Sequence, residues 1–303
     1  MHIFTAVVET RAFTQAADKL DISRAAVSKH VADLEAQLGG RLLNRTTRSV
    51  SLTEAGSAYY DRCRQILDDI DDAECLVNGL SSEPRGTLRI NAPMSFGTRH
   101  FAPLVAGFCA RNPRIDVDLT LNDRLIDMVD EGYDLLVRIA HPSDSSLVAR
   151  RISNSQSVLA ASPAYLDRAG RPEVPADLAT HQCLRYSYAW SSQNWQLREG
   201  EKTFDVAVQG PLTANNGDVL CGAAIAGMGI CRLPTFICGE ALERGELELV
   251  LPGYTPPAEG IYLVYPSKRF LSAKVRQFID FIVEETTNSD VWDFGMDSTQ
   301  TAS

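Results

Sequence analysis

The stretch from residue 13 to residue 32, FTQAADKLDISRAAVSKHVA, constrains the fold more than any other part of the chain. Its apolar residues recur at helical spacing on both sides of Asp21-Ile22, which predicts two short helices joined by a tight turn. The first helix is expected to end at Leu20 and the second to begin at Ser23. The residues predicted to be buried between the helices are Phe13, Ala16, Ala17, Leu20, Ala26, Val27, Val31 and Leu34.

The second of these helices also has a polar and cationic face, opposite its apolar residues. A short basic face on the second helix of a closely packed pair is typical of a helix-turn-helix whose second helix enters the DNA major groove. An ordinary helical hairpin with a solvated charged face is the alternative. The candidate groove contacts are Arg24, Ala25, Ala26, Ser28, Lys29 and His30.

A basic segment, RLLNRTTRSVSLT at 41–53, follows the glycine pair that is expected to end this helix. Alternation from Arg48 to Leu52 predicts a small β-hairpin. After a recognition helix such a hairpin is a wing, and Arg45, Thr46 and Arg48 would contact DNA phosphates. A solvated basic loop is the alternative. The apolar stripe in residues 1–10 predicts a further helix that completes a three-helix head.

Thr53 is expected to cap a long helix that runs to about Leu80. Apolar residues along this helix follow alternating steps of four and three, which is a heptad seam. A seam this narrow suits one partner helix, so residues 54–82 are predicted to form a linker that dimerises the chain. Packing against the same chain is the alternative. The predicted seam consists of Tyr59, Cys63, Ile66, Ile70, Ala73 and Val77.

Charge is distributed unevenly along the sequence. The net charge of −10 argues against nucleic-acid binding by the chain as a whole. Residues 1–53, however, hold seven Lys/Arg and five Asp/Glu and are net +2, whereas residues 54–83 are net −6. The positive field is therefore local to the N-terminal segment, as a DNA-binding head requires.

The compartment follows from what the sequence lacks. No stretch approaches the roughly 20 apolar residues of a membrane span, and no signal peptide is recognisable, so a cytoplasmic protein is expected. The seven cysteines form no CxxC pair, which favours reduced, buried thiols over a redox-sensing pair. The helical pattern is already under way at Met1, so the natural start is expected slightly upstream.

Residues 3–56 resemble the DNA-binding region of LysR-type transcriptional regulators. Arg24-Ala25 stands where many members have Gln-Pro, and Arg24 would favour guanine where Gln would favour adenine. The resemblance implies a winged helix-turn-helix domain over 1–53 and a tetramer built as a dimer of dimers. The residues that carry it are Phe4, Val8, Glu9, Phe13, Ala16-Ala17, Leu20, Ala26-Val27-Ser28, Leu34-Glu35, Leu38-Gly39, Leu42, Arg45 and LTEAG at 52–56.

Beyond a short hinge at 81–86, strands alternate with helices. The first set predicts a mostly parallel sheet, with strands over 88–92, 115–121 and 135–139 and helices over 98–111 and 125–131. Further strands are expected over 147–152 and 157–161. A second α/β set has strands over 183–186, 204–208, 212–215 and 247–251 and a helix over 218–226. A strand over 261–265 and a helix over 272–284 are expected to return to the first half.

This order, and the phrases GTLRINAP, DLLVRI, ASPAYL and GMGICRLP, resemble the effector domain of the same family, which is like a periplasmic binding protein. The resemblance implies an effector-binding domain over 86–285, with lobe I over about 86–161 and 266–285 and lobe II over about 162–265. The tail at 287–303 is expected to be disordered. The predicted fold class is α+β multidomain: a winged helix-turn-helix, a long coiled-coil linker helix and a two-lobed α/β domain.

Two loops at strand ends are candidate effector sites. Ser95 and Thr98 offer hydroxyls beside free helix N–H groups, which suits a carboxylate. Asn216 and Asp218 begin a helix of the second half, and the resemblance places both loops at a cleft between lobes. Plain helix capping is the alternative for both loops, and an internal ion pair is the alternative for Arg138. The candidate effector contacts are Met94, Ser95, Phe96, Thr98, Arg138, Tyr186 and Asn216, with Trp190 beside Tyr186 in an aromatic wall.

Catalytic signatures are absent from the sequence, which has no GxSxG, GxxxxGK or HExxH. The scattered histidines and the acidic run at 68–72 predict no metal site, and no cofactor is expected. The predicted function is a sequence-specific transcriptional regulator, not an enzyme, controlled by an anionic or aromatic metabolite that closes the cleft. The rivals are an α/β enzyme and a small-molecule binding or transport protein with a fused helical head. The expected partners are promoter DNA, the effector and a second copy of the chain, with RNA polymerase as a further candidate and no membrane.

Overall fold

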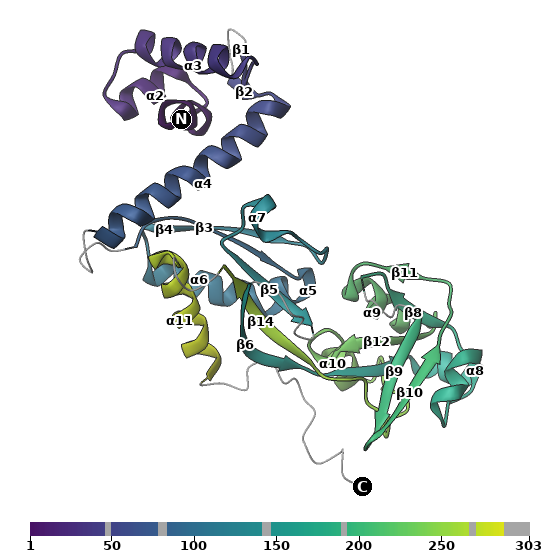
Figure 1. Cartoon of the computed structure of the whole chain (residues 1–303). Coiled ribbons are helices and arrows are strands. Elements are labelled where there is room, and N and C mark those ends of the chain that lie inside the picture. Colours follow the sequence, from purple (N-terminus) through teal and green to yellow (C-terminus); the bar gives the residue numbers. More distant parts are fainter. Residues whose placement is uncertain (46–49, 78–83, 141–146, 189–192, 267–270, 288–303) are drawn as a thin grey trace. The chain divides into compact units, whose positions relative to one another are not determined.

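The computed structural model describes residues 1–45, 50–77, 84–140, 147–188, 193–266 and 271–287. The chain divides into two compact units, Met1–Gly86 and Thr87–Ser303 (Figure 1). Within the described ranges, no helix combines the length and the apolar character needed to cross a membrane.

Three helices form the core of the N-terminal unit: α1 (His2–Thr10), α2 (Phe13–Leu20) and α3 (Arg24–Leu38). The turn between α2 and α3 is tight because Asp21 adopts a left-handed conformation, with φ 52°. The Ser23 hydroxyl then caps α3 by accepting a hydrogen bond from the Ala26 N–H at 3.1 Å. The predicted helix pair and its turn are confirmed. The shared core consists of Phe4, Ala6, Val7, Ala16, Ala17, Val27, Val31, Leu42, Leu43 and Cys63.

A small antiparallel hairpin follows α3. Its strands β1 (Leu43–Arg45) and β2 (Val50–Leu52) pair Leu43 with Leu52 and Arg45 with Val50. The predicted hairpin is therefore present, although Thr46 and Arg48, at 46–49 between the strands, lie outside the described residues.

Helix α4 (Glu54–Val77) begins where the sequence predicts, because the Thr53 hydroxyl accepts a hydrogen bond from the Gly56 N–H at 2.9 Å. Its first turns pack on the same chain: Cys63 is 1% exposed in the core of the unit, and the Tyr59 ring contacts that of Phe4 at 5.6 Å between centroids. The prediction that Cys63 contacts a partner helix is therefore wrong, because heptad spacing does not distinguish a partner from the same chain. Ile70, further along the seam, is 48% exposed.

The C-terminal unit contains two five-stranded sheets. The first has the order β4 (Ile115–Leu121), β3 (Gly86–Ala92), β5 (Leu135–Ala140), β14 (Glu259–Tyr265), β6 (Val148–Ser155). Strands β3 and β5 are parallel, as the sequence predicts, and β6 runs in the same direction, whereas β14 runs antiparallel to both of its neighbours, so the complete sheet is mixed. The helices of this lobe are α5 (Met94–Phe96), η1 (Gly97–Phe101, a π-helix), α6 (Ala102–Arg111), α7 (Met128–Glu131) and α11 (Ala273–Thr287).

The second sheet has the order β11 (Thr213–Ala214), β8 (Cys183–Tyr186), β12 (Ile230–Pro234), β7 (Ser157–Ala161), β13 (Glu248–Leu249). A hairpin of β9 (Asn194–Glu199) and β10 (Lys202–Ala207) lies beside it. The helices of this lobe are α8 (Pro163–Ala169), η2 (Pro175–Thr180, a 3-10 helix), α9 (Gly217–Ile225) and α10 (Thr235–Glu243).

The chain crosses between the lobes earlier than the sequence analysis expects, at both crossings. Strand β7 belongs to the second sheet, so the first crossing lies at Gln156 and not after residue 161. Strand β14 belongs to the first sheet, which confirms the predicted return of the strand over 261–265, so the lobe boundary lies before Glu259 and not at residue 266. The assignment of β7 to the first lobe fails because an apolar strand pattern does not specify which sheet the strand joins.

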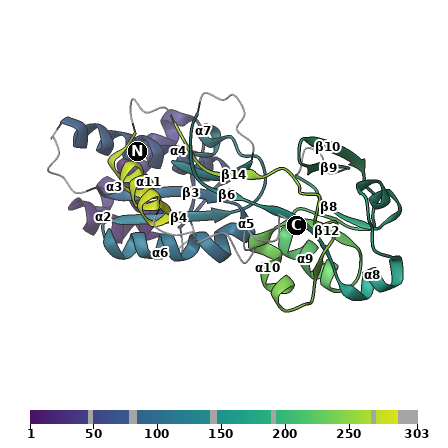
Figure 2. The same cartoon turned by 90° about the horizontal axis from the view of Figure 1, so that it is seen from below.

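A continuous apolar core joins the two lobes. It includes Phe96 and Phe101 from the first lobe and Leu220, Phe236 and Ile237 from the second. The rings of Phe96 and Phe236 meet edge to face at 5.7 Å between centroids. Figures 1 and 2 accordingly place α5 beside α10 in both views. This junction positions the side chains of the site.

Candidate functional site

The exposed face of α3 carries the predicted DNA contacts. Arg24, Ala25, Lys29 and His30 are exposed, whereas Ala26 and Ser28 are half-buried. Val27 and Val31 hold the opposite face in the core. Neither Arg24 nor Lys29 makes an ion pair with any residue that the structure describes, in contrast to Lys19, whose Nζ lies 2.9 Å from Glu9 Oε2. The cationic groups on this face are thus available to a partner.

The wing is held against α3 by one carboxylate. Glu35 Oε1 accepts hydrogen bonds from the backbone N–H groups of Leu42 and Leu43, at 2.9 and 3.0 Å. Arg45 ends the first strand of the wing. The structure therefore places the base of the wing next to the C-terminal half of the recognition helix.

In the C-terminal unit, Ser95 and Asp218 meet across the lobe junction. Ser95, on α5, is 6% exposed, and its hydroxyl donates a 2.6 Å hydrogen bond to Asp218 Oδ2. Arg99, on η1, donates to Asp218 Oδ1 from Nη2 at 2.7 Å and from Nε at 3.1 Å. Asn216 caps α9, its Oδ1 accepting from the Val219 N–H at 3.1 Å. The capping alternative thus describes Asn216, whereas Asp218 binds the other lobe.

A second tie between the lobes lies beside the first. Asp123, in the loop after β4, accepts a hydrogen bond from the Met94 backbone N–H at 2.9 Å and another from the hydroxyl of Tyr186, on β8. Burial raises the pKa values of both Asp123 and Tyr186. Carboxylates from both lobes therefore converge on the start of α5.

Arg138, on β5, brings a second guanidinium to this region. Its Nη1 donates to Asn91 Oδ1 at 2.8 Å and to the Val137 carbonyl at 2.9 Å. Its Nη2 is buried and has no hydrogen-bond partner among the described residues, and burial lowers the pKa of the side chain. The internal ion pair that was the alternative for Arg138 is not formed within the described part of the chain. A spare buried N–H of this kind favours an acceptor supplied from outside.

The remaining predicted effector residues divide into two groups. Met94 and Thr98 are exposed beside Ser95. The ring of Tyr186 contacts that of Tyr188, with 6.2 Å between the ring centroids. Phe96, by contrast, is fully buried against Phe236. The prediction that Phe96 contacts an effector is therefore wrong, because this side chain belongs to the core between the lobes. Trp190 lies outside the described residues.

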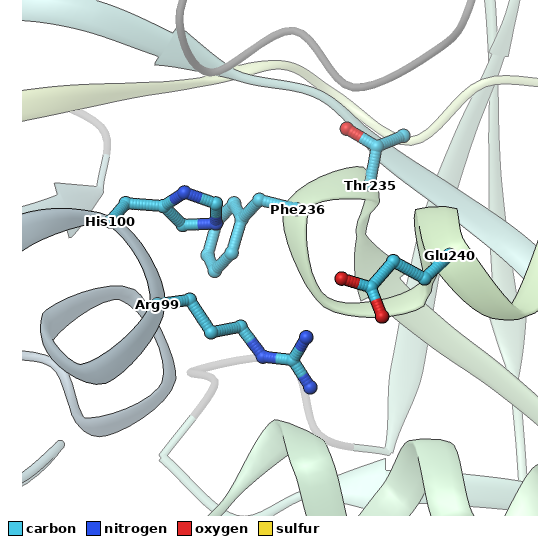
Figure 3. Close-up of a pocket in the computed structure, with 5 residues that line it drawn as sticks. All are labelled: Arg99, His100, Thr235, Phe236 and Glu240. Carbon is cyan, nitrogen blue, oxygen red and sulfur yellow. The ribbon is translucent and has the colours of Figure 1, made fainter.

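A cavity of about 210 Å³ opens beside Arg99 (Figure 3). Arg99 and His100, from η1, face Thr235, Phe236 and Glu240, from α10. Burial lowers the pKa of His100, and a hydrogen bond with the Phe236 backbone opposes this shift. Sequence reasoning missed Arg99, although it stands four residues after Ser95 and so shares one helix face with it.

The described residues contain little that favours a metal site or a reactive thiol. No group of three His, Cys, Asp or Glu side chains there could hold a metal ion. Six described cysteines are free thiols, and all but Cys109 are buried. Burial raises the pKa values of Cys183 and Cys238 to about 12, which suppresses the reactive thiolate.

Comparison with known proteins identifies relatives along the whole chain. Residues 1–57 match the model of the bacterial regulatory helix-turn-helix protein, lysR family, and residues 81–287 match that of the LysR substrate binding domain. An uncharacterized HTH-type transcriptional regulator of Haemophilus influenzae is 43% identical over 273 residues, which cover 90% of this chain and 95% of the relative.

Two full-length solved structures are similar over nearly the same extent. AphB, a virulence activator of Vibrio cholerae, gives a TM-score of 0.60 at 30% identity, covering 94% of this chain and 97% of that chain. CrgA, a LysR-type regulator from Neisseria meningitidis, also gives a TM-score of 0.60, at 33% identity and with the same coverage. The similarity therefore extends across both units.

Proposed function

The chain belongs to the LysR family of bacterial transcriptional regulators, with a DNA-binding helix-turn-helix and an effector-binding domain, and from this we propose how its own residues divide the work. Arg24, Ser28 and Lys29 face the base edges of the major groove, flanked by Ala25, Ala26 and His30. The wing residues Arg45, Thr46 and Arg48 contact the phosphate backbone. Acting on promoter DNA in this way places the protein in the cytoplasm.

The observation that carries the proposal is the uncommitted cationic face of α3. Arg24 and Lys29 are exposed and make no ion pair with described residues, whereas several arginines of the other unit, among them Arg99, Arg111, Arg124 and Arg171, are paired with acids. Pairing these cations with phosphates or guanines releases condensed counterions. DNA therefore supplies the partners that the described acidic residues do not supply.

We further propose that the chain acts as a dimer through α4, and as a tetramer built from two such dimers. The outer part of the predicted seam, from Ile66 through Ile70 to Ala73 and Val77, carries this contact, while Tyr59 and Cys63 serve the head. Ile70 is 48% exposed, and an exposed isoleucine on this seam supports a partner helix at that position. Paired heads would read two half-sites about one DNA turn apart. RNA polymerase is a further partner in this proposal.

The effector in this proposal is a small anionic or aromatic metabolite. Ser95, Arg138 and Tyr186 supply a hydroxyl, a spare guanidinium N–H and an aromatic ring, with Met94, Thr98 and Asn216 at the margin of the site. Support comes from the buried Nη2 of Arg138, which lacks an acceptor among the described residues. The ligand controls DNA binding only in so far as it binds one arrangement of the assembly better than another.

A footprinting experiment tests the division of roles. The full chain is incubated with the DNA upstream of its own gene, and Arg48→Ala is compared with the wild type over a range of salt. The proposal predicts two protected half-sites, and for Arg48→Ala weaker binding on every sequence with a salt slope shallower by about 1. A changed base preference at an unchanged slope contradicts the phosphate role, and no protection at any salt contradicts the proposal as a whole.

A further inference from the structure

The group that Ser95 and Arg99 hold in this structure is the chain's own carboxylate. The sequence predicts an effector carboxylate at the loop of Ser95, yet Asp218 of the other lobe occupies this position, with one oxygen on the Ser95 hydroxyl and the other on the Arg99 guanidinium. Asp218 stands 123 positions further along the chain. A hydroxyl and two guanidinium N–H groups converging on one carboxylate form a charge-assisted arrangement that suits any carboxylate of similar size.

We propose that Asp218 is a built-in substitute for the carboxylate of a ligand, and that a ligand carboxylate displaces it from Ser95 and Arg99. This inference rests on the proposed effector site and specifies how that site is regulated. Without a ligand, Asp218 ties α9 of the second lobe to α5 and η1 of the first. With a ligand, the tie passes from Asp218 to the bound molecule, so occupancy and the contact between the lobes change together.

The Asp218 contact is weak enough for a ligand to compete with it. Side-chain exposure is 36% for Arg99 and 39% for Asp218, and ion pairs at this level of exposure contribute little to stability. Ser95, in contrast, is 6% exposed and is held by its place in α5. Loss of Asp218 therefore leaves the receiving hydroxyl in position.

Unused donors and adjacent space favour a carboxylate as the competitor. Arg99 donates to Asp218 from Nε and Nη2, and its Nη1 makes no hydrogen bond with described residues. Arg99 also lines the cavity of about 210 Å³ in Figure 3, so there is open space beside its side chain. Arg138 offers the further spare N–H described above. A cationic ligand would meet two guanidinium groups in this region.

Chemical rescue with acetate tests the proposal on the full chain. Asp218→Ala leaves the Ser95 hydroxyl and Arg99 without their carboxylate, and amide hydrogen exchange is followed in peptides covering 94–101 and 217–225. The variant should exchange about fivefold faster than the wild type in both segments. Sodium acetate, compared with sodium chloride at equal ionic strength, should restore protection in both. The wild type should respond less, because Asp218 competes with the added acetate.

Two further variants make the result specific. In Asp218→Ala/Arg99→Gln acetate should restore nothing, because the cation that binds it is gone. Asp205→Ala is the matched control, since Asp205 is an exposed aspartate of the same lobe whose side chain, among the described residues, accepts from Gln196 alone. The exchange of this variant in the two segments should not respond to acetate. Equal rescue in the double variant, or no rescue of Asp218→Ala, overturns the proposal. Asp218→Asn, which keeps the side-chain volume, repeats the first comparison should Asp218→Ala not fold.

The outcome is independent of DNA binding. Rescue by acetate in a protein that protects no upstream DNA would keep the carboxylate site and reject the regulatory function. Protection of upstream DNA without any rescue would keep the regulatory function and reject the role of Asp218.

Discussion

Glu35 and Leu42 join the recognition helix to the wing, with Glu35 Oε1 accepting the Leu42 N–H at 2.9 Å and the Leu43 N–H at 3.0 Å. A single carboxylate thus satisfies two backbone donors at the start of the hairpin. This contact couples the two parts of the head that are proposed to touch DNA, because a displaced wing would carry its arginines away from the phosphates.

Glu35→Ala should loosen the wing without disturbing the helix pair. The two lost hydrogen bonds to a charged acceptor should destabilise the head by about 1–2 kcal/mol. Hydrogen exchange at residues 41–45 should accelerate while α2 and α3 stay protected, and DNA affinity should fall on all sequences alike. Glu35→Gln keeps one acceptor oxygen, so its exchange rates and its DNA affinity should lie between those of the wild type and those of Glu35→Ala. Equal loosening of α2 would show that Glu35 supports the whole head instead.

Gly56 is required by the close approach of α4 to the wing. A Cβ at this position would lie 1.9 Å from the Leu42 carbonyl oxygen, which is backbone and cannot rotate away. Gly56→Ala should therefore destabilise the head by about 3 kcal/mol. Gly40→Ala is the control, since nothing lies within 4 Å of its Cβ position. Denaturant unfolding monitored in the head should separate the two variants, and similar midpoints would contradict the packing argument.

His100 should make the lobe junction sensitive to acid. Burial lowers its pKa below the ordinary value of 6.5, so between the lowered pKa and 6.5 the unfolded chain binds more protons than the folded one. The contribution of His100 to the free energy of unfolding is therefore complete above pH 6.5 and is lost as the pH falls through the lowered pKa. The thermal midpoint of the effector-binding unit should drop on acidification more in the wild type than in His100→Gln. An identical drop in both proteins would remove His100 from this role.

The buried cysteines should resist alkylation. A pKa of about 12 for Cys183 and Cys238 leaves so little thiolate near pH 8 that iodoacetamide should react on the order of a thousandfold more slowly than with a free thiol. Cys109 is only partly buried and should be modified first among the six described cysteines. Mass spectrometry of individual peptides over time gives the order. Early labelling of Cys183 or Cys238 would contradict this prediction and would favour a redox-sensing pair.

Local structure in this chain is predictable from short-range pattern, and long-range contact is not. Leu20, Ser23 and Thr53 mark helix ends in the sequence, and the structure confirms them, because caps and turns depend on neighbouring residues only. Cys63 fits a heptad seam equally well whether its partner is another chain or the head of its own, and burial settles it in favour of the head.

In the candidate site, too, local features are predictable from the sequence and long-range contacts are not. Ser95 is identifiable as a binding residue because it follows a strand and begins a helix. Its partner Asp218 is identifiable only as a cap or a ligand contact, since nothing in the sequence relates two positions 123 residues apart. The lobe assignment of strand β7 fails for the same reason, because sheet membership is decided by tertiary pairing.

The central claim, that α3 reads a specific DNA sequence, is tested most directly by fluorescence anisotropy with the full chain. A duplex from the region upstream of the gene is compared with a shuffled duplex of the same composition at one salt concentration, for the wild type and for Arg24→Ala. The account predicts that the wild type binds the upstream duplex at least about a thousandfold more tightly, and that Arg24→Ala reduces this ratio about tenfold. Equal affinity of the wild type for the two duplexes would contradict it.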